Sequence, residues 1–181
     1  MADKQIAFIR GINVGRAKRV SMSDLRRLCV DLGFTDVKTL LNSGNVVFTA
    51  PRSTPVKSAS MIEDALFESC GISARVTVIT SVELSGIINE NSIAPMAMDP
   101  SRLLVTILSN PSDAKRLKSL EKKSWRPEAL AIGKRAVYQW CPDGILASKL
   151  AQAIGRELGD AATARNWATM MKLDAIANES E

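Results

Sequence analysis

The stretch Ile6-Ala7-Phe8-Ile9-Arg10-Gly11-Ile12-Asn13-Val14-Gly15 sets the beginning of the fold. Its apolar first half predicts a buried strand. The strand runs into a loop of glycine, asparagine and basic residues, and Ser21-Met22-Ser23-Asp24 beyond it predicts the start of a helix. A strand, a glycine-containing basic loop and a helix in this order can present backbone N–H groups and cations to an anion. The stretch therefore locates a candidate binding site without naming a reaction.

The elements that follow predict a βαββαβ order for the first half of the chain. We expect strands at residues 5–10, 36–41, 45–49 and 74–79, with helices at residues 21–32 and after a loop at 51–60. Asn42-Ser43-Gly44-Asn45 predicts a tight turn between the second and third strands, because glycine accepts a positive φ. This order is the split βαβ, or ferredoxin-like, pattern.

The second half of the chain partly repeats this order. The segment Thr80-Ser81-Val82-Glu83 predicts a capping box that opens a short helix, and Asn110-Pro111 predicts the start of another. Strands are expected at 103–108, 129–132 and 136–140, and helices at 145–158 and 166–177, with no evident final strand.

We therefore expect an α+β protein that is a tandem of two ferredoxin-like (βαββαβ) subdomains. The first would span residues 1–80 and the second residues 81–181, packed intimately as one unit. The second subdomain is expected to be incomplete or to carry an extra C-terminal helix. A single α+β domain with one sheet remains open as the alternative.

Composition indicates a soluble globular protein. The 181 residues are 46% hydrophobic and 24% charged, and no apolar run approaches the roughly 20 residues that a membrane span needs. The N-terminus lacks the apolar core of a secretory signal, so we expect a cytoplasmic location. The three cysteines include no CxxC pair, and Cys29 lies on an apolar helical face, which favours a buried structural thiol over a nucleophile.

The chain has no histidine, and this excludes several kinds of chemistry. Ser-His-Asp and Cys-His catalytic sets are ruled out, as are the common histidine-containing zinc sites. Any catalysis must use carboxylates, lysine, tyrosine or substrate positioning alone. The sequence therefore points to no catalytic residue, no metal site and no cofactor, and whether the protein is an enzyme stays open.

Two polar loops are expected to meet at one edge of the first sheet. In a βαββαβ fold the first and third strands are antiparallel neighbours, which brings the end of the first strand beside the start of the third.

Net charge is a mild +5, which permits an anionic partner. We predict a site for a nucleotide or a phosphorylated metabolite, formed by Arg10, Gly11, Asn13, Gly15, Ser43, Gly44 and Asn45.

A third polar segment, Arg165-Asn166, is a further candidate for this site. It precedes Trp167 at the expected start of the last helix, where an anion would be favoured. Docking of Trp167 in the core is the competing explanation for the segment.

Two other functions remain open from the sequence. A basic run could attract a nucleic-acid backbone, although it is most simply a solvated helix face: Lys115, Arg116, Lys118, Lys122, Lys123 and Arg126. The first and third strands also faintly match the signature strands of an RNA-recognition motif, but aromatic residues are only 4% of the chain. Alternatively, these motifs serve the fold, and function resides in binding to a protein partner.

The motifs together resemble the bacterial domain-of-unknown-function family 1697. The resemblance runs from Ile6 to Leu173 and includes the first loop, the turn at 42–45 and Thr163-Ala164-Arg165-Asn166-Trp167-Ala168-Thr169. It implies two ferredoxin-like subdomains and no established activity, substrate or cofactor. The chain departs from the family pattern at Arg16, where a glycine is usual, and at Ala164, where a second threonine is usual.

Overall fold

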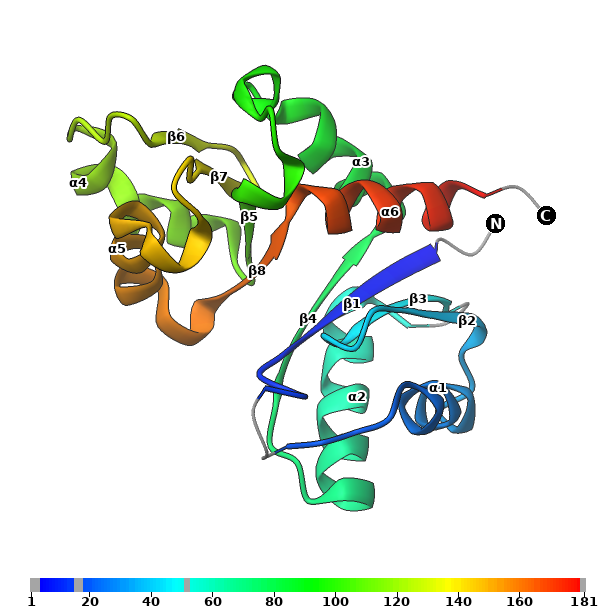
Figure 1. The fold of residues 1–181 in the computed structure, drawn as a ribbon. Helices are drawn as coiled ribbons and strands as arrows, with labels where there is room; N and C mark the ends of the chain where they lie inside the picture. Colours follow the sequence, from blue (N-terminus) through cyan, green and yellow to red (C-terminus); the bar gives the residue numbers. More distant parts are fainter. Residues whose placement is uncertain (1–3, 15–17, 51–52, 180–181) are drawn as a thin grey trace. The chain divides into compact units, whose positions relative to one another are not determined.

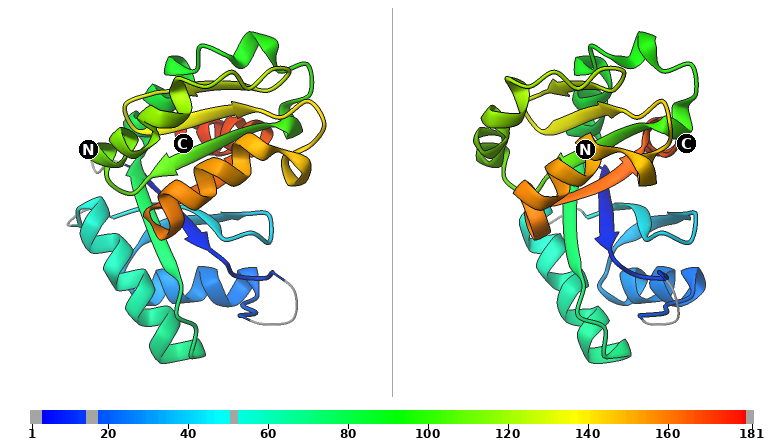
Figure 2. Two further views of the ribbon diagram at one scale, coloured as in Figure 1. Left: turned by 90° about the vertical axis from the view of Figure 1, so that its left-hand side faces the viewer. Right: turned by 60° about the vertical axis from the view of Figure 1, so that its left-hand side comes forward.

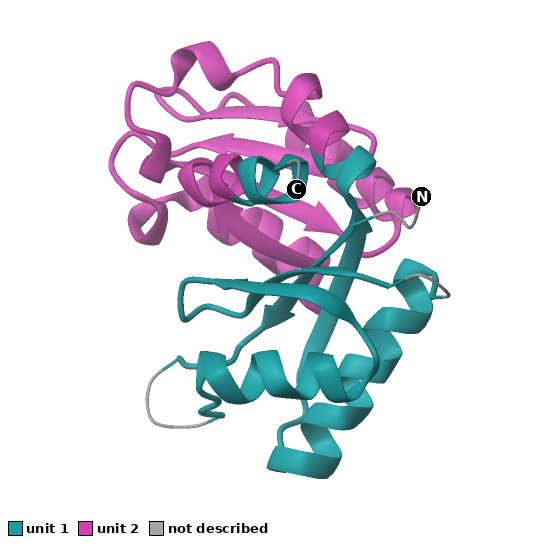
Figure 3. Ribbon diagram, turned by 90° about the vertical axis from the view of Figure 1, so that its right-hand side faces the viewer, with its two compact units in different colours: residues 1–84, 173–181 teal, residues 85–172 magenta. Residues whose placement is uncertain are grey.

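The computed structural model describes residues 4–14, 18–50 and 53–179 as a mixed α+β protein with two four-stranded antiparallel sheets. The chain forms two compact units (Figure 3). Unit 1 comprises residues 1–84 together with 173–181, and unit 2 comprises residues 85–172. Each unit contains one sheet.

Unit 1 follows the predicted βαββαβ order. Its sheet has the order β2-β3-β1-β4, so that β1 lies in the middle beside β3 and β4. The register places Phe8 opposite Asn45 on β3 and opposite Thr77 on β4. The elements are β1 (Lys4–Arg10), α1 (Met22–Asp31), β2 (Thr35–Leu40), β3 (Asn45–Thr49), α2 (Pro55–Cys70) and β4 (Arg75–Thr80).

Helices α1 and α2 cover the same face of this sheet (Figure 1). Successive strand residues point to opposite faces, so Ala7 and Ile9 face the helices while Phe8 lies on the other face. On α1 the predicted apolar face is confirmed, with Leu25 and Cys29 fully buried in the core against β1.

The helices of unit 1 begin where capping residues satisfy their first N–H groups. The Ser21 hydroxyl accepts from the Asp24 amide at 3.0 Å and caps α1. Thr54 caps α2, which therefore starts at Pro55, inside the segment 51–60 that was expected to be loop. The capping box before α3 (Ser81–Glu90) is confirmed, since Thr80 and Glu83 exchange hydrogen bonds between their side chains and amides.

Unit 2 has the sheet order β6-β7-β5-β8. Its strands are β5 (Leu103–Leu108), β6 (Ala129–Ile132), β7 (Ala136–Trp140) and β8 (Ala162–Asn166). The expectation that this half is incomplete is wrong, because β8 pairs with β5 as a fourth strand. The extra C-terminal helix is confirmed as α6 (Trp167–Asn178), whose last residues belong to unit 1.

The strand β8 was not predicted, because its sequence, ATARN, lacks the β-branched and aromatic run that indicates a strand. It is an edge strand, held by pairing along β5 from Ala162 opposite Leu108 to Asn166 opposite Leu104. The last helix was expected at 166–177 and begins at Trp167. Asn166 caps this helix, since its Oδ1 accepts from the Thr169 amide at 2.9 Å.

The helices between the strands of unit 2 cover one face of its sheet. These are the 3-10 helix η3 (Pro111–Leu117), α4 (Lys118–Glu121) and α5 (Lys149–Leu158). Figure 2 shows α5 along the sheet, where Leu150 and Ile154 are buried against Leu108 and Val137. Short 3-10 helices occur at 94–96, 100–102, 145–147 and 159–161.

On the opposite face of this sheet, the Tyr138 hydroxyl donates to the Ile87 carbonyl of α3 at 2.6 Å. Burial, with a smaller contribution from Glu90, raises the pKa of Tyr138 above its ordinary value. Tyr138 therefore anchors α3 as a neutral hydrogen-bond donor. None of the helices in the described part of the chain has the length and apolar character needed to cross a membrane.

Candidate anion-binding site

The loop between β1 and α1, called the first loop below, lies against the turn between β2 and β3, as the strand order predicts. The Ile9 amide donates to the Gly44 carbonyl at 2.8 Å, which extends the contact between β1 and β3 past the last strand pair. Farther along the loop, Asn13 Nδ2 donates to the Asn42 carbonyl at 2.9 Å. The two segments therefore form one surface of unit 1.

Asn13 organises the first loop through its side-chain amide. Its Nδ2 also donates to the Val20 carbonyl at 2.9 Å, and its Oδ1 accepts from the Val20 amide at 3.0 Å. Its backbone has a positive φ of 57°, a conformation that asparagine tolerates better than most residues. Both amide hydrogens of Asn13 are thus engaged within unit 1, and the residue holds the loop closed across the segment between positions 13 and 20.

The β2–β3 turn is held equally tightly. Asn45 is fully buried, and its Nδ2 donates to the Leu40 carbonyl at 2.9 Å and to Ser43 Oγ at 3.0 Å. Gly44 has a φ of +77°, and a Cβ there would lie 2.8 Å from Ile12 Cδ1. A glycine is required at this position because the first loop approaches the turn so closely.

A pocket of about 510 Å³ opens where the first loop, the start of α1 and the β2–β3 turn meet. Arg19 is part of its lining, as are Ser21 and Met22 at the start of α1. The N–H groups of Met22 and Ser23, in the first turn of α1, have no protein acceptor within the described residues. The lining is Asn13, Arg19, Val20, Ser21, Met22 and Asn42.

Only part of the predicted site lines this pocket. Asn13 does, whereas Arg10, at the end of β1, lies half-buried on the sheet face opposite the helices, directly across from Arg75. Gly11 is exposed with a φ of +72°, and Ser43 is exposed in the turn. Gly15 lies outside the described residues.

Arg165 and Asn166 lie in unit 2, and their contribution to the same site stays a prediction. Arg165 is half-buried on β8, and its Nη1 donates to the Ala164 carbonyl at 2.8 Å and to Thr163 Oγ1 at 3.2 Å. Burial lowers the pKa of Arg165 to about 10. A desolvated cation of this kind is a feature of many functional sites. The Asn166 side chain is occupied by its capping bond to Thr169.

Sequence reasoning missed Arg19, Ser21 and Asn42 as lining residues. Ser21 was recognisable as a helix cap, and a cation two residues before a cap would lie close to the exposed amides of the helix start. Asn42 was read only as a turn residue. Its backbone carbonyl binds Asn13, and this long-range contact has no signal in the local sequence.

Other sites proposed from the sequence have less structural support. The rings of Phe8 and Phe48 are both fully buried, so neither offers the exposed stacking surface that an RNA-recognition motif uses. In the basic run, Arg116 donates to the Glu157 carbonyl and lies 3.7 Å from Asp113, whereas Lys115, Lys118, Lys122 and Lys123 are exposed. The described residues contain no cluster of three or more potential metal ligands.

Comparisons with known proteins give the family of the chain and support its fold. The conserved bacterial protein SP0830 from Streptococcus pneumoniae has a similar structure, with a TM-score of 0.79 and 20% sequence identity over 98% of this chain and 100% of that one. A search of curated proteins found no match. A family model described as "Protein of unknown function (DUF1697)" matches residues 2–138. The chain belongs to the DUF1697 family.

Proposed function

We propose that this protein binds a small anionic ligand, a nucleotide or a phosphorylated metabolite, in the pocket at the start of α1. The observation that carries the proposal is one pocket of about 510 Å³ that is lined by Arg19 and by Met22 at the start of α1, whose amide has no acceptor within the described residues. Guanidinium and backbone N–H groups are the donors that proteins use for phosphate oxygens. The volume falls within the range of small-molecule sites.

The residues predicted from the sequence have defined parts in this proposal. Asn13, Gly44 and Asn45 fix the shape of the two loops, and Gly11 allows the chain to turn after β1. Ser43 would extend the site along the turn, whereas a part for Arg10, on the other face of the sheet, stays a prediction from the sequence. The parts of Arg165, Asn166 and Gly15 in ligand binding stay predictions from the sequence.

The proposal is tested by thermal unfolding with inorganic phosphate, AMP, ADP, ATP and ribose 5-phosphate. A ligand that binds only the folded state raises the Tm, by an amount that grows with its concentration above Kd. Arg19→Gln should weaken binding of the stabilising compound by about tenfold or more, since hydrogen bonds to charged groups contribute ~1.5–3 kcal/mol. Arg156→Gln, an exposed arginine of α5, is the matched control. No shift with any compound, or equal binding by Arg19→Gln, would refute the proposal.

We also propose that both units are ferredoxin-like subdomains, with the boundary near residues 80 and 81. The support is that unit 1 has the sheet order β2-β3-β1-β4 and unit 2 the equivalent order β6-β7-β5-β8, each with helices after its first and third strands. We further propose a cytoplasmic location, which fractionation of the native host would test.

Nucleic-acid binding is the alternative function, and the exposed lysines at 115, 118, 122 and 123 favour it. They lie in unit 2, on η3 and α4 and just after them, away from the pocket residues in sequence. A role limited to protein partners is the third alternative, and unchanged function in cells after Arg10→Ala and Asn45→Ala would favour it.

A further inference from the structure

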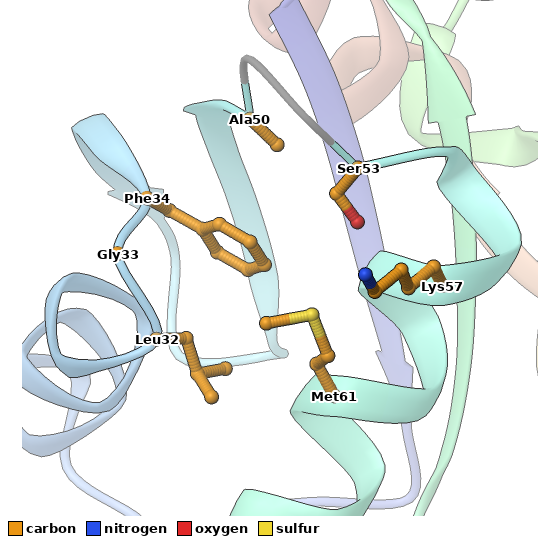
Figure 4. A pocket seen from close by; sticks show the side chains of 7 residues that line it. All are labelled: Leu32, Gly33, Phe34, Ala50, Ser53, Lys57 and Met61. Carbon is orange, nitrogen blue, oxygen red and sulfur yellow. The ribbon is translucent and has the colours of Figure 1, made fainter.

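We propose a second ligand site in unit 1, for a small apolar molecule that carries one carboxylate. It is a pocket of about 470 Å³ between the end of α1, the end of β3 and the start of α2 (Figure 4). Its lining is Leu32, Gly33, Phe34, Ala50, Ser53, Lys57 and Met61. None of these residues lines the pocket at the start of α1, so the two sites are separate.

Most of this pocket is apolar. Phe34 is held in place by stacking on Phe48, with ring centroids 4.5 Å apart. Leu32, at the end of α1, and Met61, on α2, turn toward the same space from opposite sides (Figure 4). Methionine adapts its shape to different apolar ligands because its side chain is unbranched and flexible. The wall therefore suits an alkyl chain or a small ring.

The polar groups of the pocket gather at the start of α2. Ser53 and Lys57 present a hydroxyl and an ammonium there (Figure 4). The Lys57 side chain makes no ion pair or hydrogen bond within the described residues, and the first turn of α2 contains no acidic residue. The ammonium and the positive end of the α2 dipole consequently act together on any anionic group at this end.

Ser53 is held in position before any ligand binds. Gln5 Nε2 donates to the Ser53 carbonyl at 2.7 Å, and Ser58 Oγ donates to Ser53 Oγ at 2.9 Å. Gln5 and Ser58 are both buried, so this support is protected from solvent. A preformed polar end beside an apolar wall is the usual composition of a small-molecule site.

The charges of the pocket select the class of ligand. The single ammonium of Lys57 matches a ligand with one negative charge. A purely polar anion such as inorganic phosphate would leave the apolar wall in contact with water. A monocarboxylate with an aliphatic or aromatic body satisfies both ends. Octanoate is a suitable probe, and octanamide is its neutral counterpart of nearly equal shape.

The test is a titration followed by ¹H–¹⁵N NMR on the full chain. Octanoate should shift the amide signals of Gly33, Ala50 and Met61 in a saturable manner, and octanamide should bind at least about threefold more weakly because it lacks the ion pair with Lys57. Lys57→Glu should weaken octanoate binding by more than the loss of affinity that octanamide shows with the parent chain. This substitution adds a glutamate three residues after the cap Thr54, which forms a capping box, so we expect it to fold.

Lys149→Glu in the first turn of α5 is the matched control, because it makes the same charge change at another capped helix start. The proposal is overturned if octanoate leaves the three signals unmoved, or if Lys57→Glu binds octanoate as tightly as the parent chain. Inorganic phosphate in a parallel titration should shift Met22 and Ser23 instead. The two sites can therefore fail independently of each other.

Discussion

Asn13 and Asn42 are joined by a hydrogen bond of 2.9 Å from the Asn13 side chain to the Asn42 carbonyl, and it links two loops that are 29 residues apart. The same side chain closes its own loop through two bonds to Val20. The two asparagines both line the pocket at the start of α1. The shape of the proposed site consequently depends on one side-chain amide.

Asn13→Asp is predicted to destabilise the loop while keeping its backbone conformation. Aspartate also tolerates a positive φ, and it retains the Oδ1 acceptor for the Val20 amide. It lacks the two N–H donors, so the carbonyls of Val20 and Asn42 are each deprived of a partner. We expect a decrease of about 1–3 kcal/mol in the free energy of unfolding, measured by urea denaturation.

Asn42→Asp provides the comparison, because its role in this contact uses only the backbone carbonyl. It should change stability much less than Asn13→Asp does. Equal effects of the two substitutions would show that added charge, and not removal of the Asn13 donors, is responsible.

Gly44→Ala is predicted to be strongly destabilising. The positive φ costs ~1–2 kcal/mol for a residue with a Cβ. The new Cβ would also lie 2.9 Å from Ile9 Cβ and 2.8 Å from Ile12 Cδ1, and overpacking of this kind costs ~1–3 kcal/mol more. Gly33→Ala separates the two causes, because Gly33 has a φ of +84° and no atom within 4 Å of the added Cβ. It should show the backbone cost alone, and similar destabilisation at both positions would contradict the close approach at Gly44.

The carboxylate of Glu179 is predicted to titrate below the ordinary range of glutamate. Lys38 Nζ donates to Glu179 Oε2 at 2.7 Å, and this hydrogen bond, with the charges of Lys38 and Lys4, holds the pKa of Glu179 down. Because the folded pKa is the lower one, the stabilising effect is present above the unfolded pKa and disappears as the pH falls through the folded pKa.

NMR titration of the Glu179 side chain tests this prediction. Lys38→Ala should return the pKa of Glu179 toward its ordinary value, while Lys118→Ala should leave it unchanged. Since both side chains of the pair are more than half exposed, raising the ionic strength should reduce the shift. If the pKa of Glu179 is unchanged in Lys38→Ala, the ion pair is not maintained in solution.

The three thiols are predicted to differ in reactivity. Cys70 is exposed, whereas Cys29 and Cys141 are buried. Burial raises the pKa of Cys29 to about 12, and burial is also the main cause of the raised pKa of Cys141. Because the thiolate is the reactive form, a thiol reagent should modify Cys70 quickly in the native protein, and Cys29 and Cys141 only on unfolding. Cys70→Ser should abolish the fast phase, and a fast phase that persists would contradict the burial of Cys29 and Cys141.

Much of the fold could be predicted because its signals are local. The run from Ile6 to Ile9 fills the centre of a sheet, and Ser21 and Thr80 act as the caps that their sequences indicate. The strand β8 lacked such a signal, since its small and polar residues become a strand only by pairing with β5.

The candidate site was less predictable for the same reason. The meeting of the first loop and the β2–β3 turn followed from strand order, and the Ile9–Gly44 hydrogen bond bears it out. Strand order did not indicate which side chains hold the loops and which line the pocket. Asn13 and Asn45 have the residue type of ligand contacts, but their amide hydrogens are engaged by protein acceptors. Asn13 donates to Val20 and Asn42, and Asn45 donates to Leu40 and Ser43 within its own turn, while Arg19 lines the pocket. Which polar side chains are engaged internally depends on tertiary contacts that no sequence pattern records.

The two candidate functions make opposite predictions for the basic run in unit 2. If the protein acts through the pocket at the start of α1, a triple variant with Lys115, Lys118 and Lys122 changed to Gln should keep the ligand-induced rise in Tm. It should differ little from the parent chain in retention of single-stranded RNA at physiological salt, because Phe8 and Phe48 are buried and stacking cannot add to the charge attraction. Filter binding at several salt concentrations measures this. Strong retention by the parent chain that falls steeply with salt and disappears in the triple variant would instead support nucleic-acid binding, since removing one lysine–phosphate ion pair reduces the salt dependence by about one counterion.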